Sequence, residues 1–222
     1  MSDSPSTATR AAGPGSPVSG LYVVTSEHPE LGRTHLDVAL AAIEGGARVV
    51  QYRDKLRHGA DLLAIASAIR ELCACRGVAF VMNDHADVAM EVRADGLHLG
   101  QRDLESRTLW RPTWDAFLGI TAWSPELAAE ARELGADYIG SGPVRPTTLK
   151  TMTREPLGFD GLRAICEVGV PVAAIGGLGM ADVAAVFGAG ASAMCVMSGI
   201  GVAADPQETV REIVSAIDKI GV

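Results

Sequence analysis

Short apolar runs of three to five residues alternate with longer amphipathic segments along most of the chain. Such runs, bounded by turn residues, are typical of buried strands in a parallel sheet. Eight strands are expected, at Leu21–Thr25, Val49–Tyr52, Ala79–Met82, Gly96–Leu99, Leu118–Thr121, Tyr138–Gly140, Val172–Ile175 and Ala193–Met197. Helices are expected to follow them, at Leu36–Glu44, Asp61–Arg76, Ala86–Val92, Pro125–Leu134, Asp160–Glu167, Met180–Phe187 and Pro206–Ile220, and the link after Leu99 is only weakly helical, around Leu104–Trp110. Thr34 and Asp37 resemble a capping box at the start of the first helix.

Eight strands, each followed by a helix or a helix-like link, predict an α/β fold, a single (β/α)8 TIM barrel. An open doubly wound sheet is the alternative, because the alternation of elements does not prove closure. Residues 1–20 are mostly Ser, Pro, Ala, Thr and Gly, which predicts a disordered, flexible tail. The predicted division is therefore a tail over residues 1–20 and a barrel domain over residues 21–222. In either fold, chemistry gathers at the carboxyl ends of the strands.

Polar and basic side chains stand where the second predicted strand ends. Gln51 and Arg53 share one face by the two-residue alternation of a strand, and Lys55 continues that face just beyond it. Pairing of these cations with a surface carboxylate such as Asp54 or Asp61 is a purely structural alternative. Gln51 weakens that alternative, because a polar side chain facing a barrel interior needs a partner.

Two carboxylates follow the next two predicted strands. Asn83 and Asp84 end the third strand, and Asp103 lies just past the fourth. Each acid is also suited to cap the helix that follows it. Neighbouring strands lie about 4.8 Å apart, so carboxylates beyond adjacent strand ends can reach one cation, and Mg²⁺ commonly takes one or two carboxylates together with phosphate oxygens. The sequence therefore predicts a Mg²⁺ site at Asp84 and Asp103, with Arg53 and Lys55 facing the phosphates.

A second anion site is predicted after the last two strands. Gly176 and Gly177 follow the seventh strand, and Met197 and Ser198 close the eighth. Glycines let backbone N–H groups approach a phosphate, and the loops after strands seven and eight are the usual phosphate site of barrel enzymes. The alternative is that these glycines only make tight turns.

The segment from residue 143 to about 156 shows neither a helical nor a strand period. It carries three cations, Arg145, Lys150 and Arg154, and lies between the two predicted anion sites. We interpret it as a loop that closes on substrate, with an ordinary surface loop as the alternative.

Composition narrows the class of ligand and the cellular compartment. The 222 residues carry a formal net charge of −8, which argues against nucleic acid as a partner. No apolar run approaches the length of a membrane span, and the N-terminus lacks a signal pattern. The four cysteines show no C-x-x-C pairing and are expected to be reduced thiols, so the predicted location is cytoplasmic. Whether the chain forms a homo-oligomer is left open.

The positions of the histidines and of possible nucleophiles do not indicate a further catalytic or metal site. His98, at the end of the fourth strand, is explained equally well as a packed core residue or as a functional group, and the five histidines form no metal-ligand pattern. No G-x-S-x-G motif is present, so covalent catalysis is not expected.

Several segments together resemble the thiamine phosphate synthase family. They are Gln51-Tyr52-Arg53-Asp54-Lys55, Asn83-Asp84, Gly96-Leu97-His98-Leu99-Gly100-Gln101-Arg102-Asp103, Ala136-Asp137-Tyr138-Ile139-Gly140, Ala174-Ile175-Gly176-Gly177 and Val196-Met197-Ser198. The resemblance extends from Leu21 to the C-terminus, with the motifs in the family's order and close to its spacing. It implies a transferase of thiamine biosynthesis that joins hydroxymethylpyrimidine diphosphate to thiazole phosphate, releasing pyrophosphate and forming thiamine phosphate through a pyrimidine cation.

The resemblance also implies a role for individual residues. Asp84 and Asp103 would bind Mg²⁺. The pyrophosphate would be held by Arg53, Lys55, Asn83 and Lys150, and Gln51 would orient the pyrimidine. Thr121 stands where the family usually has a serine near the leaving group, and Thr147 matches a threonine of the loop. Gly177, Met197 and Ser198 would lie at the thiazole phosphate.

Two departures from the family pattern keep other functions open. The loop reads Pro146-Thr147-Thr148-Leu149-Lys150 where the family has a second hydroxyl before the lysine, and Arg145 replaces a common aromatic residue. These departures bear on loop closure and turnover rate, and they favour a non-catalytic phosphate-ligand sensor as one alternative. A thiazole tautomerase-like enzyme is another, although its catalytic histidine would fall near Trp123, which cannot transfer protons. A different phosphate-binding barrel isomerase would leave the facing carboxylates and cations unexplained.

Overall fold

A closed barrel of eight parallel strands forms the centre of the molecule. The computed structural model describes residues 16–105, 112–147 and 155–221. The strands follow one another around the barrel in chain order, and β1 pairs with β8 to close it. They are β1 (Gly20–Val24), β2 (Val49–Tyr52), β3 (Ala79–Asn83), β4 (Gly96–Leu99), β5 (Phe117–Thr121), β6 (Tyr138–Ser141), β7 (Val172–Ile175) and β8 (Ala193–Val196). The predicted TIM barrel is therefore confirmed, and the open sheet is excluded.

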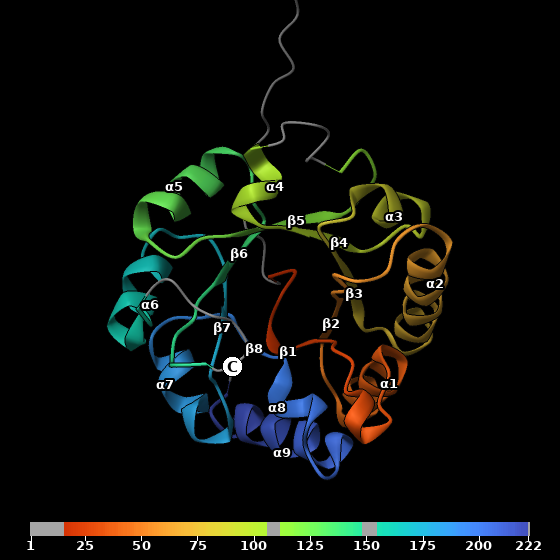
Figure 1. Cartoon of the computed structure of the whole chain (residues 1–222). Coiled ribbons are helices and arrows are strands. Elements are labelled where there is room, and N and C mark those ends of the chain that lie inside the picture. The colour runs from red at the N-terminus through yellow and green to blue at the C-terminus, as the bar shows by residue number, and fades with distance from the viewer. Residues whose placement is uncertain (1–15, 106–111, 148–154, 222) are drawn as a thin grey trace, which may run out of the picture.

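Helices surround the strands as an outer ring (Figure 1). Within the described residues they are η1 (Pro29–Leu31), α1 (His35–Gly45), α2 (Gly59–Arg76), α3 (Ala86–Glu91), α4 (Gln101–Glu105), α5 (Pro125–Glu133), α6 (Gly158–Cys166), η2 (Met180–Asp182), α7 (Val183–Gly188), α8 (Ser198–Gly201) and α9 (Pro206–Lys219). The helix expected at Leu104–Trp110 begins earlier, at Gln101, and residues 106–111 lie outside the described part. The one expected at Met180–Phe187 is divided into η2 and α7, because the Asp182 carboxylate turns back to accept a hydrogen bond from the Gly179 N–H at 3.0 Å.

The barrel begins a few residues before the predicted boundary at Leu21. Gly20 already belongs to β1, and Val18 is completely buried in the cluster of side chains inside the barrel. Ser16 supports this entry, since its hydroxyl donates to the Val18 carbonyl at 2.6 Å. A single buried valine among small and polar residues gives no periodic signal, which is why composition alone placed residues 16–20 in the tail. Residues 1–15 lie outside the described part.

The strands present alternate side chains to two different cores. One set fills the barrel interior: Val18, Tyr22, Val24, Val49, Val81, Tyr138, Ala173, Ala193 and Cys195. The other set packs between the strands and the helices and is the larger of the two. Burial on both faces explains why the strands are continuous apolar runs in the sequence.

Glycines make room for the aromatic rings inside the barrel. Phe117 on β5 pairs in register with Gly96 on β4, and Tyr138 on β6 pairs with Gly119 on β5. A Cβ atom on either glycine would overlap the ring of its partner. Each ring therefore occupies the space that a side chain on the preceding strand would otherwise fill.

The first helix begins at the capping box expected from the sequence. Thr34 Oγ1 accepts a hydrogen bond from the Asp37 N–H, and the Asp37 carboxylate accepts one from the Thr34 N–H at 2.9 Å. We expect Thr34→Ala to lower the free energy of unfolding by about 1 kcal/mol in urea denaturation, because the Asp37 N–H at the start of the helix loses its side-chain acceptor. Glu71→Ala, an exposed change within α2, is the control and should change it by less than about 0.5 kcal/mol. Equal values for the two variants would contradict a stabilising cap.

Two further features concern the cysteines and the length of the helices. All four cysteines are unpaired. Among the described residues, no helix combines the length and apolar character needed to cross a bilayer.

Candidate active site at the carboxyl ends of the strands

Three of the predicted site residues meet where β2, β3 and β4 end. The Lys55 ammonium, beyond β2, donates to the Asp84 carboxylate, beyond β3. The carboxyl group of Asp103, in α4 just after β4, lies within hydrogen-bonding reach of Asp84. We refer to Lys55, Asp84 and Asp103 as the carboxylate cluster. Its geometry agrees with the prediction that acids beyond adjacent strand ends come together.

The cluster holds more negative than positive charge. Burial tends to raise the pKa of Asp84, but the hydrogen bond and positive charge of Lys55 outweigh burial and hold that pKa below its ordinary value. Burial raises the pKa of Asp103, and the neighbouring Asp84 charge raises it further. Two adjacent carboxyl groups sharing one ammonium favour an additional cation between them.

The backbone at Asp84 is held in an unusual conformation. Its φ is +63°, in the left-handed region that few non-glycine residues adopt, and aspartate is among those that tolerate it. The Asp84 N–H donates to the His98 carbonyl at 2.9 Å, which ties the end of β3 to β4. Asp84 does not cap α3, because the N-cap position belongs to His85, which makes no side-chain cap bond. The capping alternative for Asp84 is therefore wrong, and the strained backbone serves to direct its carboxylate.

Asp103 lies inside α4 and does not cap a helix that follows it, whereas its role as a metal ligand stays a prediction. Its Oδ2 accepts a hydrogen bond from the Gly100 N–H at 2.8 Å, closing the first turn of α4. The same carboxyl group faces Asp84. Anchoring by the backbone therefore fixes the position of one half of the carboxylate pair.

The donor set fits a hard divalent cation. Two carboxylates supply oxygen ligands of the kind that Mg²⁺ prefers. Within the described residues, no group of three or more His, Cys, Asp or Glu side chains could enclose a metal ion. The remaining ligands would have to be water or substrate oxygens, which matches the usual way in which proteins hold Mg²⁺.

Arg53 and Asn83 line the same mouth. Arg53 is half-buried just past β2, and Asn83 is buried at the end of β3. The structural alternative, in which Arg53 and Lys55 pair with surface carboxylates such as Asp54 or Asp61, fails for Lys55, which pairs with Asp84. Asp54 instead accepts from the Arg57 guanidinium at 2.7 Å and from the Leu56 N–H at 2.8 Å.

Asp54 organises a separate buried network beside the mouth. Burial opposes its charge, but the hydrogen bonds from Leu56 and Arg57 hold its pKa well below the ordinary value. Arg57 also pairs with Glu27 at 2.8 Å, which links the ends of β1 and β2. His35 lies 3.5 Å from Asp54, and burial lowers the pKa of its imidazole. This network fixes the turn that carries Lys55.

Gln51 and Thr121 are joined through the barrel interior. The Gln51 amide donates to the Tyr22 hydroxyl at 2.6 Å, and the Thr121 hydroxyl lies 2.9 Å from His98 Nε2. Between them, the Tyr138 hydroxyl bonds both Tyr22, at 2.9 Å, and His98 Nδ1, at 2.8 Å. Gln51 thus has the partner that its inward-facing position required. His98, which the sequence left undecided, belongs to this network and not to a purely apolar core.

The glycines after β7 lie against the loop that follows β6. Gly176 has a φ of +102°, and a Cβ there would lie 2.6 Å from Pro143. Gly177 has a φ of +68°, and a Cβ there would overlap the Pro146 carbonyl. These glycines are therefore required by backbone packing, which supports the tight-turn alternative and leaves their contact with phosphate a prediction.

The Arg145 side chain also links the loop after β6 to the segment after β7. Its Nε lies 2.6 Å from Asp182 Oδ1, and its guanidinium carbon lies 5.1 Å from the centroid of the Phe159 ring. Arg145 therefore holds the start of the β6–α6 loop against η2. Thr147 is half-buried in this loop, whereas Lys150 and Arg154 lie outside the described residues. Met197 and Ser198 mark the entry into α8.

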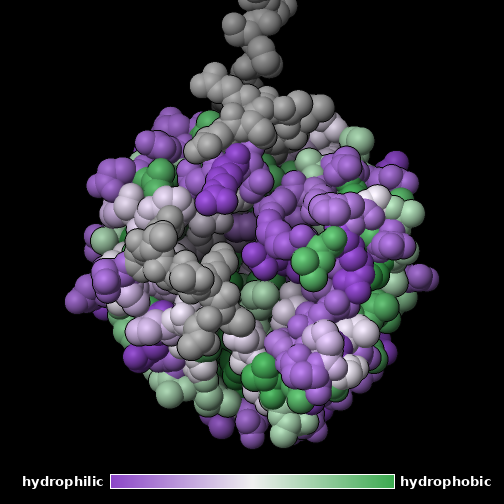
Figure 2. All heavy atoms as spheres, in the orientation of Figure 1, coloured by the Kyte–Doolittle hydropathy of each residue, from purple (hydrophilic) through white to green (hydrophobic). Residues whose placement is uncertain are grey.

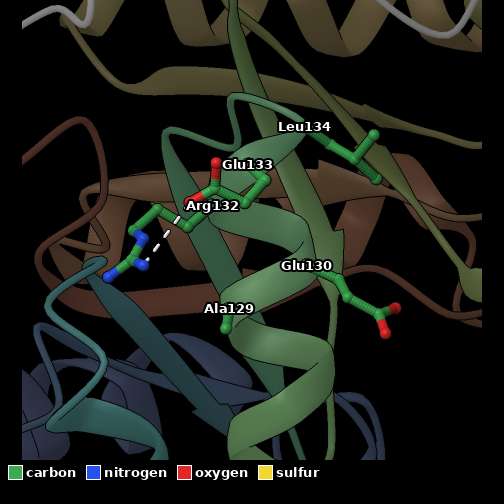
Figure 3. Close-up of a pocket in the computed structure, with 5 residues that line it drawn as sticks. All are labelled: Ala129, Glu130, Arg132, Glu133 and Leu134. Atoms are coloured by element: carbon green, nitrogen blue, oxygen red, sulfur yellow. Dashed lines mark hydrogen bonds and ion pairs between the residues drawn. The ribbon is translucent and has the colours of Figure 1, made fainter.

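The barrel mouth differs from a second hollow, which lies along α5. Figure 2 shows hydrophilic residues beside a depression near the centre of the face turned toward the viewer. A shallow hollow elsewhere lies along α5, over Ala129, Glu130 and Leu134, where Arg132 and Glu133 pair at 3.4 Å (Figure 3). The end of α5 leads back to the amino end of β6, so this hollow lies at the end of the barrel opposite the carboxylate cluster.

Comparison with known proteins decides the family. Residues 21–200 match the family described as thiamine monophosphate synthase. The chain belongs to this family. It is 41% identical over 194 residues to the thiamine-phosphate synthase of Chloroflexus aurantiacus, covering 87% of this chain and 90% of the relative. It is 40% identical over 184 residues to that of Methanospirillum hungatei, covering 82% and 89%.

A solved structure agrees with the sequence relatives. The thiamine phosphate pyrophosphorylase of Pyrococcus furiosus superposes with a TM-score of 0.81 at 30% identity, covering 93% of this chain and 98% of that one. The family resemblance is therefore confirmed, and with it the assignment of this thiamine monophosphate synthase family member to the transferases of thiamine biosynthesis.

The sequence of this family member did not indicate that Tyr22, Tyr138 and Gln101 bond to residues of the candidate site. The two tyrosines lie inside apolar strands, where they count as ordinary core residues. A signal existed, because Gln51 needed an interior partner and a tyrosine two positions before Val24 faces the same interior. Gln101 donates to the Thr121 carbonyl at 2.5 Å and so holds α4 against the end of β5.

Proposed function

We propose that this protein joins hydroxymethylpyrimidine diphosphate to thiazole phosphate in a Mg²⁺-dependent reaction that yields thiamine phosphate and pyrophosphate. The carboxylate cluster carries the proposal, in a chain that belongs to the thiamine monophosphate synthase family. Paired carboxyl groups next to a lysine serve a substrate that brings its own phosphate charges and a metal ion.

The residues of the mouth divide between the two substrates. Arg53, Lys55 and Asn83 would hold the diphosphate, together with Lys150 of the β6–α6 loop. Thr121 and Thr147 would donate hydrogen bonds near the leaving group, and Gln51 would orient the pyrimidine. The thiazole phosphate would lie at the glycine turn and at the entry into α8, near Gly177, Met197 and Ser198.

Bond breaking would precede bond making. The bond between the pyrimidine methylene carbon and the diphosphate oxygen breaks, and both electrons leave with pyrophosphate. The cation left on the methylene group is stabilised by the electron-rich pyrimidine ring, and the thiazole nitrogen then donates its lone pair to form the new C–N bond. Mg²⁺ held by Asp84 and Asp103 would neutralise the charge of the departing pyrophosphate. The side chains position the reactants and stabilise charge.

Lys55 would change partners during this cycle. Its ammonium pairs with Asp84 in the structure. Asp84 and Asp103 would hold the cation, and Lys55 would then pair with the diphosphate, one strand away. This exchange couples occupation of the carboxylate cluster to capture of the leaving group.

The decisive assay measures pyrophosphate release with both substrates present. We expect release that needs both substrates and that falls by at least about 100-fold when the metal is chelated, because the metal contributes several kcal/mol of charge stabilisation. Restoration by added Mg²⁺ is the matching control. Binding of both compounds without release of pyrophosphate would contradict the proposal and favour a phosphate-ligand sensor.

The proposed cytoplasmic location belongs to the same proposal. Its support is the set of four unpaired cysteines, since free thiols persist in reducing compartments.

A further inference from the structure

A continuous row of hydrogen bonds crosses the barrel interior below the mouth. We call it the interior network, and its members in order are Gln51, Tyr22, Tyr138, His98 and Thr121. Its two ends are the residues proposed to face the pyrimidine and the leaving group. The three residues between those ends, on β1, β6 and β4, have no place in the proposed chemistry.

The donors and acceptors of the interior network can be assigned in order. Gln51 donates its amide N–H to the Tyr22 oxygen, so the single Tyr22 proton is available for the Tyr138 oxygen. Tyr138 then has its own proton to donate to His98 Nδ1. A nitrogen that accepts carries no proton in a neutral imidazole, so the proton of His98 is on Nε2, which donates to the Thr121 oxygen.

The reverse order fails at Tyr22. If Tyr138 donated to Tyr22, the Tyr22 oxygen would accept two hydrogen bonds, and its own proton would point at neither of the partners that this hydroxyl has in the described barrel. A buried donor without an acceptor costs about 1–3 kcal/mol. With the Gln51 amide nitrogen facing Tyr22, only this direction satisfies each member, and the reverse direction requires the amide to turn its oxygen toward Tyr22.

Burial keeps the two tyrosine hydroxyls of the interior network protonated. Tyr22 and Tyr138 are completely shielded from solvent, and burial raises the pKa of both hydroxyls, so neither loses its proton near neutral pH. The space for these rings depends on glycines: a Cβ on Gly140 would lie 2.6 Å from His98 Cε1. The rings are therefore closely fitted to the strands around them.

We propose that the interior network sets the hydrogen-bonding character of its two ends, so that Gln51 presents its carbonyl oxygen as an acceptor while Thr121 presents its hydroxyl proton as a donor. Tyr22, Tyr138 and His98 are positioning residues that act through Gln51 and Thr121. Reversing the direction of the row would turn Gln51 into a donor and use up the Thr121 proton at the same time. The two ends are thus coupled, although they stand on β2 and β5.

An acceptor at Gln51 and a donor at Thr121 suit the proposed reaction. This part of the inference rests on the proposed function. An aminopyrimidine offers an amino donor beside a ring-nitrogen acceptor, and a side-chain amide with its oxygen directed outward can accept from the amino group. A leaving diphosphate offers only acceptor oxygens, so it needs the Thr121 proton. One direction of the interior network satisfies both requirements.

The first test reads the direction of the network without any activity assay. Nitrogen NMR of ¹⁵N-histidine-labelled protein, at about pH 8 where histidine is ordinarily neutral, distinguishes the protonated from the unprotonated ring nitrogen. His98→Gln identifies the signal by its loss. We expect His98 to carry its proton on Nε2, and Tyr138→Phe to produce a mixture of both tautomers. A proton on Nδ1 in the unmodified protein would overturn the proposal.

The second test is kinetic and has a matched control. Tyr138→Phe removes the central hydroxyl and should lower kcat/KM for the pyrimidine diphosphate by about 10- to 100-fold, the effect of losing one buried hydrogen bond. The KM for thiazole phosphate should change by less than about twofold. Trp114→Phe removes a half-buried N–H that donates to the Ala94 carbonyl at 2.7 Å, just before the amino end of β4 and away from the mouth, and it should leave both constants within about twofold of the original. Tyr22→Phe provides a second break in the row.

The outcomes separate this proposal from the proposed function. If the unmodified protein releases no pyrophosphate, the function fails while the tautomer measurement still decides the direction of the network. If the protein is active but Tyr138→Phe retains both the tautomer and kcat/KM, the interior network has no positioning role. A kinetic loss in Tyr138→Phe without a tautomer change would also overturn the proposal, because Tyr138 would then act in some way other than by orienting His98.

Discussion

Asp84→Asn should reduce Mg²⁺-dependent pyrophosphate release by about 1,000-fold, the largest effect on activity that we expect from a single polar substitution. The change removes one charge, and asparagine tolerates the left-handed backbone that Asp84 adopts (φ +63°). The loss should therefore reflect weaker charge stabilisation, worth several kcal/mol, and not altered folding. Steady-state kinetics over a range of Mg²⁺ concentrations measures the effect, and a higher Mg²⁺ requirement should accompany the lower kcat.

A neighbouring acid supplies the control for Asp84. Asp87 lies three residues further along, exposed in the first turn of α3. Asp87→Asn removes the same charge from the same region and should leave the rate within about twofold. Turnover by Asp84→Asn at the original rate and with the original Mg²⁺ requirement would remove Asp84 from the metal site.

Gly119→Ala should be the most destabilising small substitution in the barrel. A methyl group on Gly119 would overlap the Tyr138 ring, its partner in register on β6. The ring has no free space to move into, because its hydroxyl is held by Tyr22 and His98. We expect a loss of about 3 kcal/mol in the free energy of unfolding, measured by urea denaturation.

Gly188→Ala is the matched change at an open position. No atom lies within 4 Å of the Cβ that it would add, and Gly188 ends α7 without a positive φ. It should keep the stability or raise it slightly, since alanine favours helix. A Gly119→Ala protein as stable as Gly188→Ala would show that the interior can rearrange around the added methyl group.

The sequence predicts the strands well because each has the same simple cause. Burial on both faces makes every strand a short apolar run, and glycines or polar residues end it, so predicted and observed limits differ by at most a residue at either end. The helices follow from their caps, as at Thr34. The pattern failed where one side chain decides the backbone path: Asp182 divides the helix expected at Met180–Phe187, and Val18 brings the chain into the barrel before Leu21.

The sequence predicts which residues form the site, but it does not predict which side chain bonds to which. Strand order places Lys55, Asp84 and Asp103 at one end of the barrel, yet nothing in the sequence says that Lys55 prefers Asp84 to the adjacent Asp54. That choice depends on Arg57, which occupies Asp54 from three residues away. Tyr22 and Tyr138 were overlooked because hydroxyl contacts between β1 and β6 link positions 116 residues apart.

The filled barrel has a consequence for how molecules reach and leave the site. Val18, Phe117 and the tyrosine rings occupy the axis from the amino ends of the strands upward, so the barrel is no tunnel. Both reactants would enter and both products would leave through the one opening at the carboxyl ends of the strands. The molecule that binds second would cover the one that binds first, so binding and release would follow a fixed order.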